Sequence, residues 1–188
     1  MDLKSGVGLL VVGLQNAWSE YAGTYPMVGF DVLSEGIGDL ISSAHSGYYA
    51  EYYGSVIFVN LFDVDLLTID SEEYTYCEYS ADSILDLFED GMATSFCVPM
   101  LNPSFDEDSL SEDIDDCETF PEWLCNSSLT DMHICGINVD IYGRKIAEKL
   151  LEAGIAPSLL VNHVSWTDPS RFVDTLNFFD LHGTLDRA

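Results

Sequence analysis

The sequence predicts an α/β fold, a three-layer Rossmann-like sandwich in which helices cover both faces of a mostly parallel sheet. Two observations support this prediction. Five short runs are almost continuously apolar, which is typical of strands buried on both faces. Helical patterns lie between these runs, and strands that alternate with helices form parallel sheets. With 188 residues, 47% of them hydrophobic, residues 1–188 suit a single domain with a buried core.

The apolar runs define the expected strands. They cover residues 7–12, 55–61, 95–99, 132–136 and 158–164. We expect the first run, VGLLVV, at the centre of the sheet, flanked by the runs at 55–61 and 132–136.

Three helices are expected before residue 126. The first covers 31–45, where apolar residues recur at helical spacing. A second covers 80–90, and a weaker one over 113–125 is interrupted by Pro121. The expected buried stripe of the first helix consists of Val32, Leu33, Ile37, Leu40, Ile41 and Ala44.

Two more helices follow the fourth run. The clearer one covers 139–152 and stops at Gly154. Asp168 and Pro169 begin the last helix as its N-cap and its first helical residue. The expected buried stripe of this helix consists of Phe172, Val173, Leu176 and Phe179.

Charge is the unusual feature of the composition. The chain has 33 acidic and 6 basic residues, a formal net charge of -27, and no Lys or Arg from residue 5 to residue 143. So few cations exclude direct binding to nucleic acid and docking on an anionic membrane. Membrane-spanning and signal-peptide patterns are lacking, so we expect a cytoplasmic protein with reduced cysteines. Cys97 and Cys135 lie in apolar runs and are expected to be buried.

Two acidic segments, around 63–79 and 102–116, are expected to be long loops inserted on the sheet. Three interpretations of the charge remain open: a merely soluble acidic face, adaptation to high salt, and a field that attracts a basic partner. Nine of the ten Tyr also lie between Tyr21 and Tyr79, among the acids. The candidate binding residues are Asp63, Asp65, Asp70, Glu72, Glu73, Glu112, Asp113, Asp115 and Asp116.

Neither a metal nor a cofactor is predicted. The five cysteines form no CxxC pair, and the four histidines are scattered. Asp63 and Asp65 have oxygen ligands of the kind that bind Ca²⁺ or Mg²⁺, but solvated loop acids are the commoner arrangement.

Two motifs follow the first and fourth runs. Residues 9–18 read LLVVGLQNAW, and residues 133–142 read HICGINVDIY. Together they resemble the isochorismatase-like cysteine hydrolases, which include nicotinamidases. That family has Asp, an apolar residue, Gln, Asn and an aromatic residue after its first strand, and later Gly-x-x-Thr-Asp-x-Cys before a helix. The order of elements matches over nearly the whole chain.

The resemblance implies three catalytic positions, and none of them holds the family's residue. Gly13 stands in place of the Asp that acts as base, and Tyr142 in place of the Cys nucleophile. Pro99 or Met100 stands in place of the Lys that lowers the thiol pKa. The chain therefore resembles a divergent member that lacks the triad.

The resemblance also implies four details of the vacated site. A cis peptide is expected between Ile137 and Asn138, and Asp140 is expected to cap the helix or accept from backbone amides. The Tyr142 ring is expected to fill the vacated pocket. Cys135 is expected to point into the sheet packing, away from that pocket.

Three functions follow for comparison. The first is an inactive isochorismatase-fold protein that binds a basic protein partner. It would act as a nucleic-acid mimic or as an inhibitor of a nucleic-acid-binding protein, as viral and mobile-element regulators do. The second is a structural or oligomeric subunit, so a homo-oligomer remains open. The third is a hydrolase with relocated chemistry at Cys97 or Cys77, which the surrounding acids oppose because they raise thiol pKa values.

Overall fold

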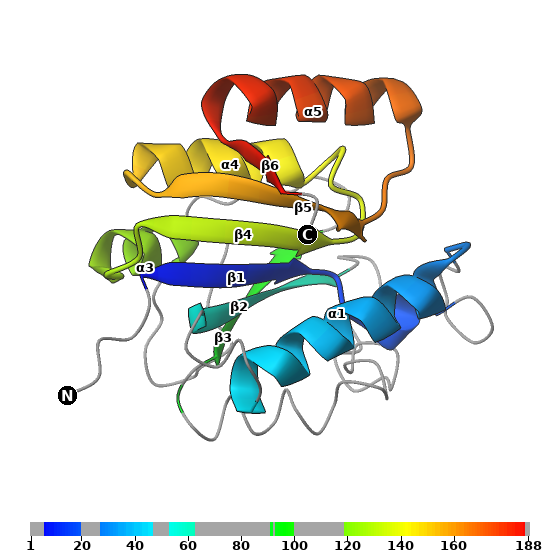
Figure 1. The fold of residues 1–188 in the computed structure, drawn as a ribbon, viewed down its shortest axis with the longest axis horizontal. Helices are drawn as coiled ribbons and strands as arrows, with labels where there is room; N and C mark the ends of the chain where they lie inside the picture. Colours follow the sequence, from blue (N-terminus) through cyan, green and yellow to red (C-terminus); the bar gives the residue numbers. More distant parts are fainter. Residues whose placement is uncertain are drawn as a thin grey trace.

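The computed structural model describes residues 6–19, 27–46, 53–62, 91, 93–99 and 119–186. Its core is a six-stranded sheet in the order β3-β2-β1-β4-β5-β6, with every neighbouring pair parallel (Figure 1). The strands are β1 (Val7–Val12), β2 (Tyr53–Phe62), β3 (Ala93–Pro99), β4 (Asp131–Gly136), β5 (Ala156–Val164) and β6 (Thr184–Asp186). The predicted α/β fold with a parallel sheet is confirmed, as is the central place of β1 between β2 and β4.

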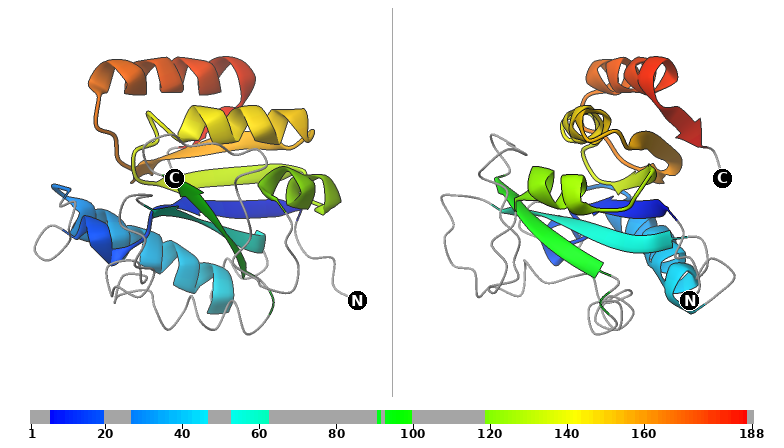
Figure 2. Two further views of the ribbon diagram at one scale, coloured as in Figure 1. Left: turned by 180° about the vertical axis from the view of Figure 1, so that it is seen from behind. Right: turned by 90° about the vertical axis from the view of Figure 1, so that its left-hand side faces the viewer.

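Helices cover both faces of this sheet. In the two views of Figure 2, α1 lies on one face and α3 and α4 lie on the other, with α5 beside α4 near the β5–β6 edge. The described helices are η1 (Asn16–Trp18), α1 (Phe30–Ser46), α3 (Phe120–Asn126), α4 (Gly143–Glu152) and α5 (Pro169–His182). None of these helices is long and apolar enough to cross a membrane.

The centre of the core is β1, because it is paired on both sides and covered on both faces. Leu9, Leu10 and Val12 are completely buried. In the sheet register Leu10 lies between Ile57 of β2 and Ile134 of β4, both of which are also fully buried. This packing explains why the apolar runs are continuous rather than alternating.

Two expected core residues are instead exposed. Val32 on α1 is 76% exposed, and Val173 on α5 is 54% exposed. On α1 the buried hydrophobic residues are Phe30, Ile37 and Ile41, and Leu33 and Leu40 are partly buried against the core. On α5 Phe172 and Phe179 are buried and Leu176 is partly buried.

Pro121 begins a helix rather than interrupting one. Thr119 is the N-cap of α3, and its side chain and that of Glu122 form a reciprocal capping box. Pro121 therefore lies in the first turn, where its missing N–H costs nothing. The part of the expected helix before Thr119, and the whole helix expected over 80–90, lie outside the described residues.

Three further details differ from expectation or were not predicted. Cys135 is fully buried as expected, but Cys97 is partly exposed because β3 is the last strand in the sheet order. The sixth strand, β6, was not predicted, because three residues carry too little periodicity to be recognised. Helix α4 begins at Gly143, later than expected, because residues 139–142 form turns.

Candidate functional site

The candidate site lies where the parallel strands end, the usual place for a site in an open α/β sheet. Gly13 follows β1, and Tyr142 immediately precedes α4. Pro99 is the last residue of β3, paired with Phe62, while Met100 is outside the described residues. The sheet thus brings the ends of β1, β3 and β4 to one edge.

Gly13 has no room for a side chain. Its φ is 65°, in the left-handed region that residues with a Cβ rarely adopt. A Cβ built there would lie 2.6 Å from Ile137 Cγ1 and 3.2 Å from Leu61 Cδ1. The space that a carboxylate would need is therefore occupied by aliphatic side chains.

Main-chain hydrogen bonds hold this packing in place. The Gly13 amide donates to the Val59 carbonyl at 2.9 Å, and the Ile137 amide donates to the Val12 carbonyl at 3.0 Å. Gly136 has a φ of 115°, and a Cβ there would lie 2.2 Å from the Val12 carbonyl oxygen. The ends of β1 and β4 are thereby fixed against each other, with Ile137 between them.

Gln15 belongs to the first motif and has a structural contact. Its side chain is buried, and its Oε1 accepts from the Leu61 amide at 2.8 Å. This bond ties the turn after β1 to the end of β2, just beyond the last paired residues of the two strands, Val12 and Val59.

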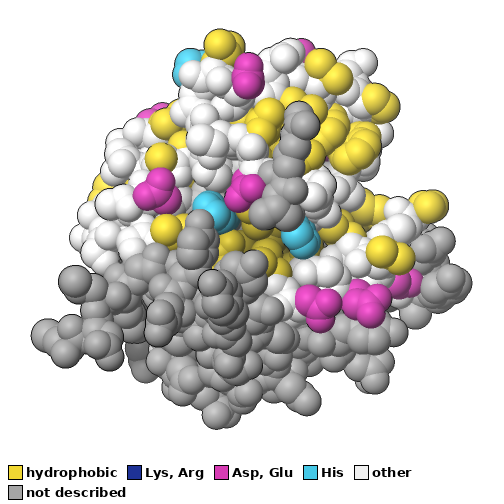
Figure 3. Space-filling model, in the orientation of Figure 1, with side chains coloured by type: hydrophobic (Ala, Val, Ile, Leu, Met, Phe, Trp, Pro, Cys, Tyr) yellow, Lys and Arg dark blue, Asp and Glu magenta, His cyan; other side chains and the backbone are white. Residues whose placement is uncertain are grey.

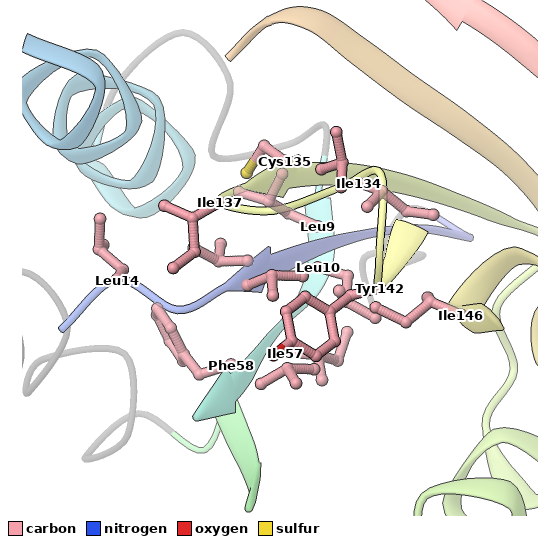
Figure 4. Packing of buried hydrophobic residues seen from close by; sticks show 14 of the residues in the cluster. Leu9, Leu10, Leu14, Ile57, Phe58, Ile134, Cys135, Ile137, Tyr142 and Ile146 are labelled. Carbon is pink, nitrogen blue, oxygen red and sulfur yellow. The ribbon is translucent and has the colours of Figure 1, made fainter. Parts of the chain in front are cut away.

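Tyr142 lies in the apolar core. The residue is 1% exposed, and Figure 4 places its ring beside Leu10, Ile57 and Ile146. Burial, with a smaller contribution from the negative charge of Asp140, raises the pKa of Tyr142 to about 12. The phenol is therefore neutral at pH 7 and is a poor nucleophile.

Cys135 is close in sequence but lies apart from Tyr142. The sheet register puts Cys135 opposite Val11, so its side chain is on the other face from Leu10, which the Tyr142 ring contacts (Figure 4). Complete burial raises the pKa of the Cys135 thiol far above its ordinary value. The thiol is thus an inert core group, in agreement with the expectation that it points into the sheet packing.

The turn after β4 differs from the expected one. Among the described residues no peptide bond is cis, so the cis bond expected between Ile137 and Asn138 is wrong. Asn138 instead has a φ of 49°, a left-handed conformation that Asn tolerates better than most residues. The Val139 amide then donates to the Ser165 carbonyl at 3.1 Å, which joins this turn to the end of β5.

Asp140 is the polar centre of the candidate site. Its carboxylate is fully buried and accepts from the Thr167 amide at 3.1 Å, the Thr167 hydroxyl at 3.1 Å and the Asp168 amide at 3.0 Å. Arg171 Nε lies 3.7 Å from the same carboxylate. The expectation that Asp140 accepts from backbone amides is confirmed, and these amides belong to the β5–α5 turn.

Asp168 continues this arrangement as the N-cap of α5. Its Oδ1 accepts from the Ser170 and Arg171 amides, as Asp168 and Pro169 predicted. These backbone bonds, together with the charge of Arg171, lower the pKa of Asp168. Sequence reasoning did not identify Ile137, Thr167 or Arg171, because their roles depend on contacts between turns that are far apart in the chain.

The nine acidic binding candidates all lie outside the described residues, so their arrangement stays a prediction. Within the described part of the chain, no group of three or more His, Cys, Asp or Glu is arranged to hold a metal ion.

No protein-family model and no curated protein matches this chain. Solved structures do match it along nearly its whole length. The nicotinamidase/pyrazinamidase of Bacillus subtilis superposes with a TM-score of 0.70 at 12% identity, over 96% of this chain and 99% of that one. The pyrazinamidase/nicotinamidase of Streptococcus mutans gives a TM-score of 0.71 at 13% identity, with coverage of 96% and 99%.

A third match broadens the comparison beyond nicotinamidases. A putative isochorismatase hydrolase from Oleispira antarctica gives a TM-score of 0.66 at 13% identity, over 98% of this chain and 95% of that one. Identities this low speak for the fold alone. The chain therefore has the isochorismatase-like α/β fold that the two sequence motifs predicted.

Proposed function

We propose that this protein is an isochorismatase-fold chain without hydrolase activity, which acts by binding a basic protein. The observation that carries the first half of the proposal is the occupied space at Gly13. A general base at that position needs a side chain, and Ile137 Cγ1 lies 2.6 Å from where its Cβ would be. A single substitution therefore does not restore the base, because the surrounding packing also has to change.

The nucleophile position supports the same conclusion. With a pKa of about 12, the Tyr142 phenol is ionised in about one molecule in 10⁵ at pH 7, and the ring is 1% exposed. No Lys or Arg occurs from residue 5 to residue 143, and Arg171 at this edge of the sheet lies against the carboxylates of Asp140 and Asp168. A buried neutral phenol and a glycine at these two positions support a chain without hydrolase activity.

The charge distribution supports the binding half of the proposal. Five of the six basic residues lie from residue 143 onward, beside six of the 33 acids, so almost the whole net charge belongs to residues 1–142. Solubility alone does not require so one-sided a distribution, since mixed charges serve it equally well. An anionic surface speeds association with cationic surfaces, of which nucleic-acid-binding proteins are the commonest kind.

An activity assay tests the first half. Purified protein incubated with nicotinamide, and separately with isochorismate, is expected to give no product above the buffer blank. The variant Tyr142→Cys is expected to remain inactive as well, because its thiol still lacks a base and a cation. Turnover that disappears when any one cysteine is replaced would instead establish a relocated hydrolase site.

A competition assay tests the second half. A linker histone serves as the basic probe, and binding is followed by the anisotropy of the labelled histone. We expect the protein to bind the histone and duplex DNA to displace the protein from the histone. The affinity of the protein for the histone should fall steeply as salt rises. Binding that ignores both salt and DNA would refute the nucleic-acid-mimic interpretation.

A further inference from the structure

We infer that the carboxyl edge of the sheet is the docking surface for the apolar face of a cationic amphipathic helix. This inference rests on the proposed function, and it adds the surface and the secondary structure of the partner. Of six large hydrophobic side chains that are exposed within the described residues, four belong to segments at this edge. They are Val28 at 90%, Val32 at 76%, Val173 at 54% and Trp166 at 45%.

Contacts between segments place these residues together. The Ser165 hydroxyl donates to Met27 Sδ at 3.1 Å, so Val28 and Trp166 each follow one member of a contacting pair. Further along α1, the His163 ring lies 3.7 Å from the Cβ position of Gly36, one turn beyond Val32. The start of α1 is therefore adjacent to the end of β5 and to the β5–α5 turn that carries Trp166.

Trp166 is held rigid in this surface. Its ring stacks on Phe172 with centroids 4.1 Å apart and an interplanar angle of 3°, while 45% of the residue stays exposed. One face of the indole is thus fixed by the core and the rest is open to solvent. A preordered, exposed Trp is the kind of side chain that contributes most to protein interfaces, because binding costs it little conformational entropy.

The charges around these apolar residues select a cationic occupant. Val32, Glu35 and Asp39 follow one another at helical spacing on α1, and both acids are exposed. Asp168 and Asp174 are close in sequence to Trp166 and Val173, and the cation in this segment, Arg171, is paired with Asp168 at 3.6 Å. Figure 3 shows a row of acidic side chains along α1, hydrophobic side chains at the end to which the strands point, and no coloured Lys or Arg on this face.

A helix that carries Leu on one side and Lys on the other fits this pattern. Its apolar side covers Val28, Val32 and Trp166, and its lysines face the acids on α1. Covering exposed valines removes apolar area from water, which we expect to strengthen binding about tenfold over the charge attraction alone.

The test uses two labelled helical peptides of about five turns. One consists of Leu and Lys, and the other replaces every Leu with Gln, which keeps helix propensity and charge. Fluorescence anisotropy is expected to give a Kd about tenfold lower for the Leu peptide. The double variant V28S/V32S is expected to abolish this advantage. L181S is the matched control, because Leu181 is 77% exposed but lies at the other end of α5.

Each outcome separates the inference from the proposed function. If neither peptide binds, the charge-based proposed function fails, and the inference falls with it. If both peptides bind with equal affinity, the inference fails while the proposed function stands. A loss of the Leu advantage in L181S as large as that in V28S/V32S would also overturn the inference, because the contact would then be unspecific.

Discussion

The turns that follow β1 and β4 are neighbours at the same edge of the sheet, but they have opposite chemical character. At the first, Gly13 has no side chain, and Ile137 and Leu61 occupy the space around it. At the second, Asp140 keeps a buried carboxylate that accepts three hydrogen bonds from the β5–α5 turn. The comparison indicates that buried hydrogen bonds hold one of these turns, whereas apolar packing holds the other.

The largest effect is expected at Asp140. Replacing it with Ala removes the acceptor of two partly buried amides and of the Thr167 hydroxyl, and the partner of Arg171. We expect the free energy of unfolding to fall by about 3–5 kcal/mol, because three hydrogen bonds to a buried carboxylate are lost and each contributes about 1.5–3 kcal/mol. Urea unfolding measures this change. The control is Asp174→Ala on the exposed surface of α5, and an equal loss in both variants would contradict the architectural role of Asp140.

A smaller effect is expected at Gly13. Gly13→Ala combines an unfavourable φ of 65° with the clash against Ile137, and we expect a loss of about 2–4 kcal/mol. A double-mutant cycle with Ile137→Ala separates these two costs. The loss from Gly13→Ala should shrink in the Ile137→Ala background but not vanish, since the backbone strain remains. Additive losses would mean that Ile137 does not block the site.

The smallest effect concerns pH. The His133 ring, bonded to the Tyr53 hydroxyl at 3.0 Å, is buried, and burial lowers its pKa against the opposing pull of Asp186 and Asp131. Its unfolded pKa is the ordinary 6.5, so the unfolded state binds more protons below that pH, and stability falls as pH falls through this range. Between pH 7 and pH 5, the free energy of unfolding should therefore depend less on pH in His133→Asn than in the wild type.

A second, partly buried histidine sharpens the pH prediction. Burial also lowers the pKa of His163, so some of the dependence should survive in His133→Asn. If the free energy of unfolding changes with pH as steeply in His133→Asn as in the wild type, His133 does not take up a proton on unfolding.

Local patterns in the sequence predicted the strands better than they predicted which side chains of the helices are buried. The continuous apolar runs predicted five of the six strands, because burial on both faces leaves a strong local pattern. The exposed Val32 and Val173 were assigned to the core because helical spacing gives the direction of a side chain but not the width of the covered stripe.

The sequence indicated which positions of the candidate site differ from the family motifs, but not how the side chains around them pack. Gly13 and Tyr142 are visible departures in the two motifs. The blockade by Ile137, the left-handed Asn138 and the ties from Asp140 to Thr167 all depend on contacts between turns, which local patterns do not encode.

The most direct measurement of whether charge rather than chemistry defines this protein is its rate of association with the basic probe as salt rises. Wild type is compared with a variant in which Glu112, Asp113, Asp115 and Asp116 are replaced together by Gln and Asn. We predict an association rate constant that falls steeply with salt, and a variant that associates more slowly while it dissociates almost unchanged. An association rate that is indifferent to salt and to this replacement would contradict the electrostatic function.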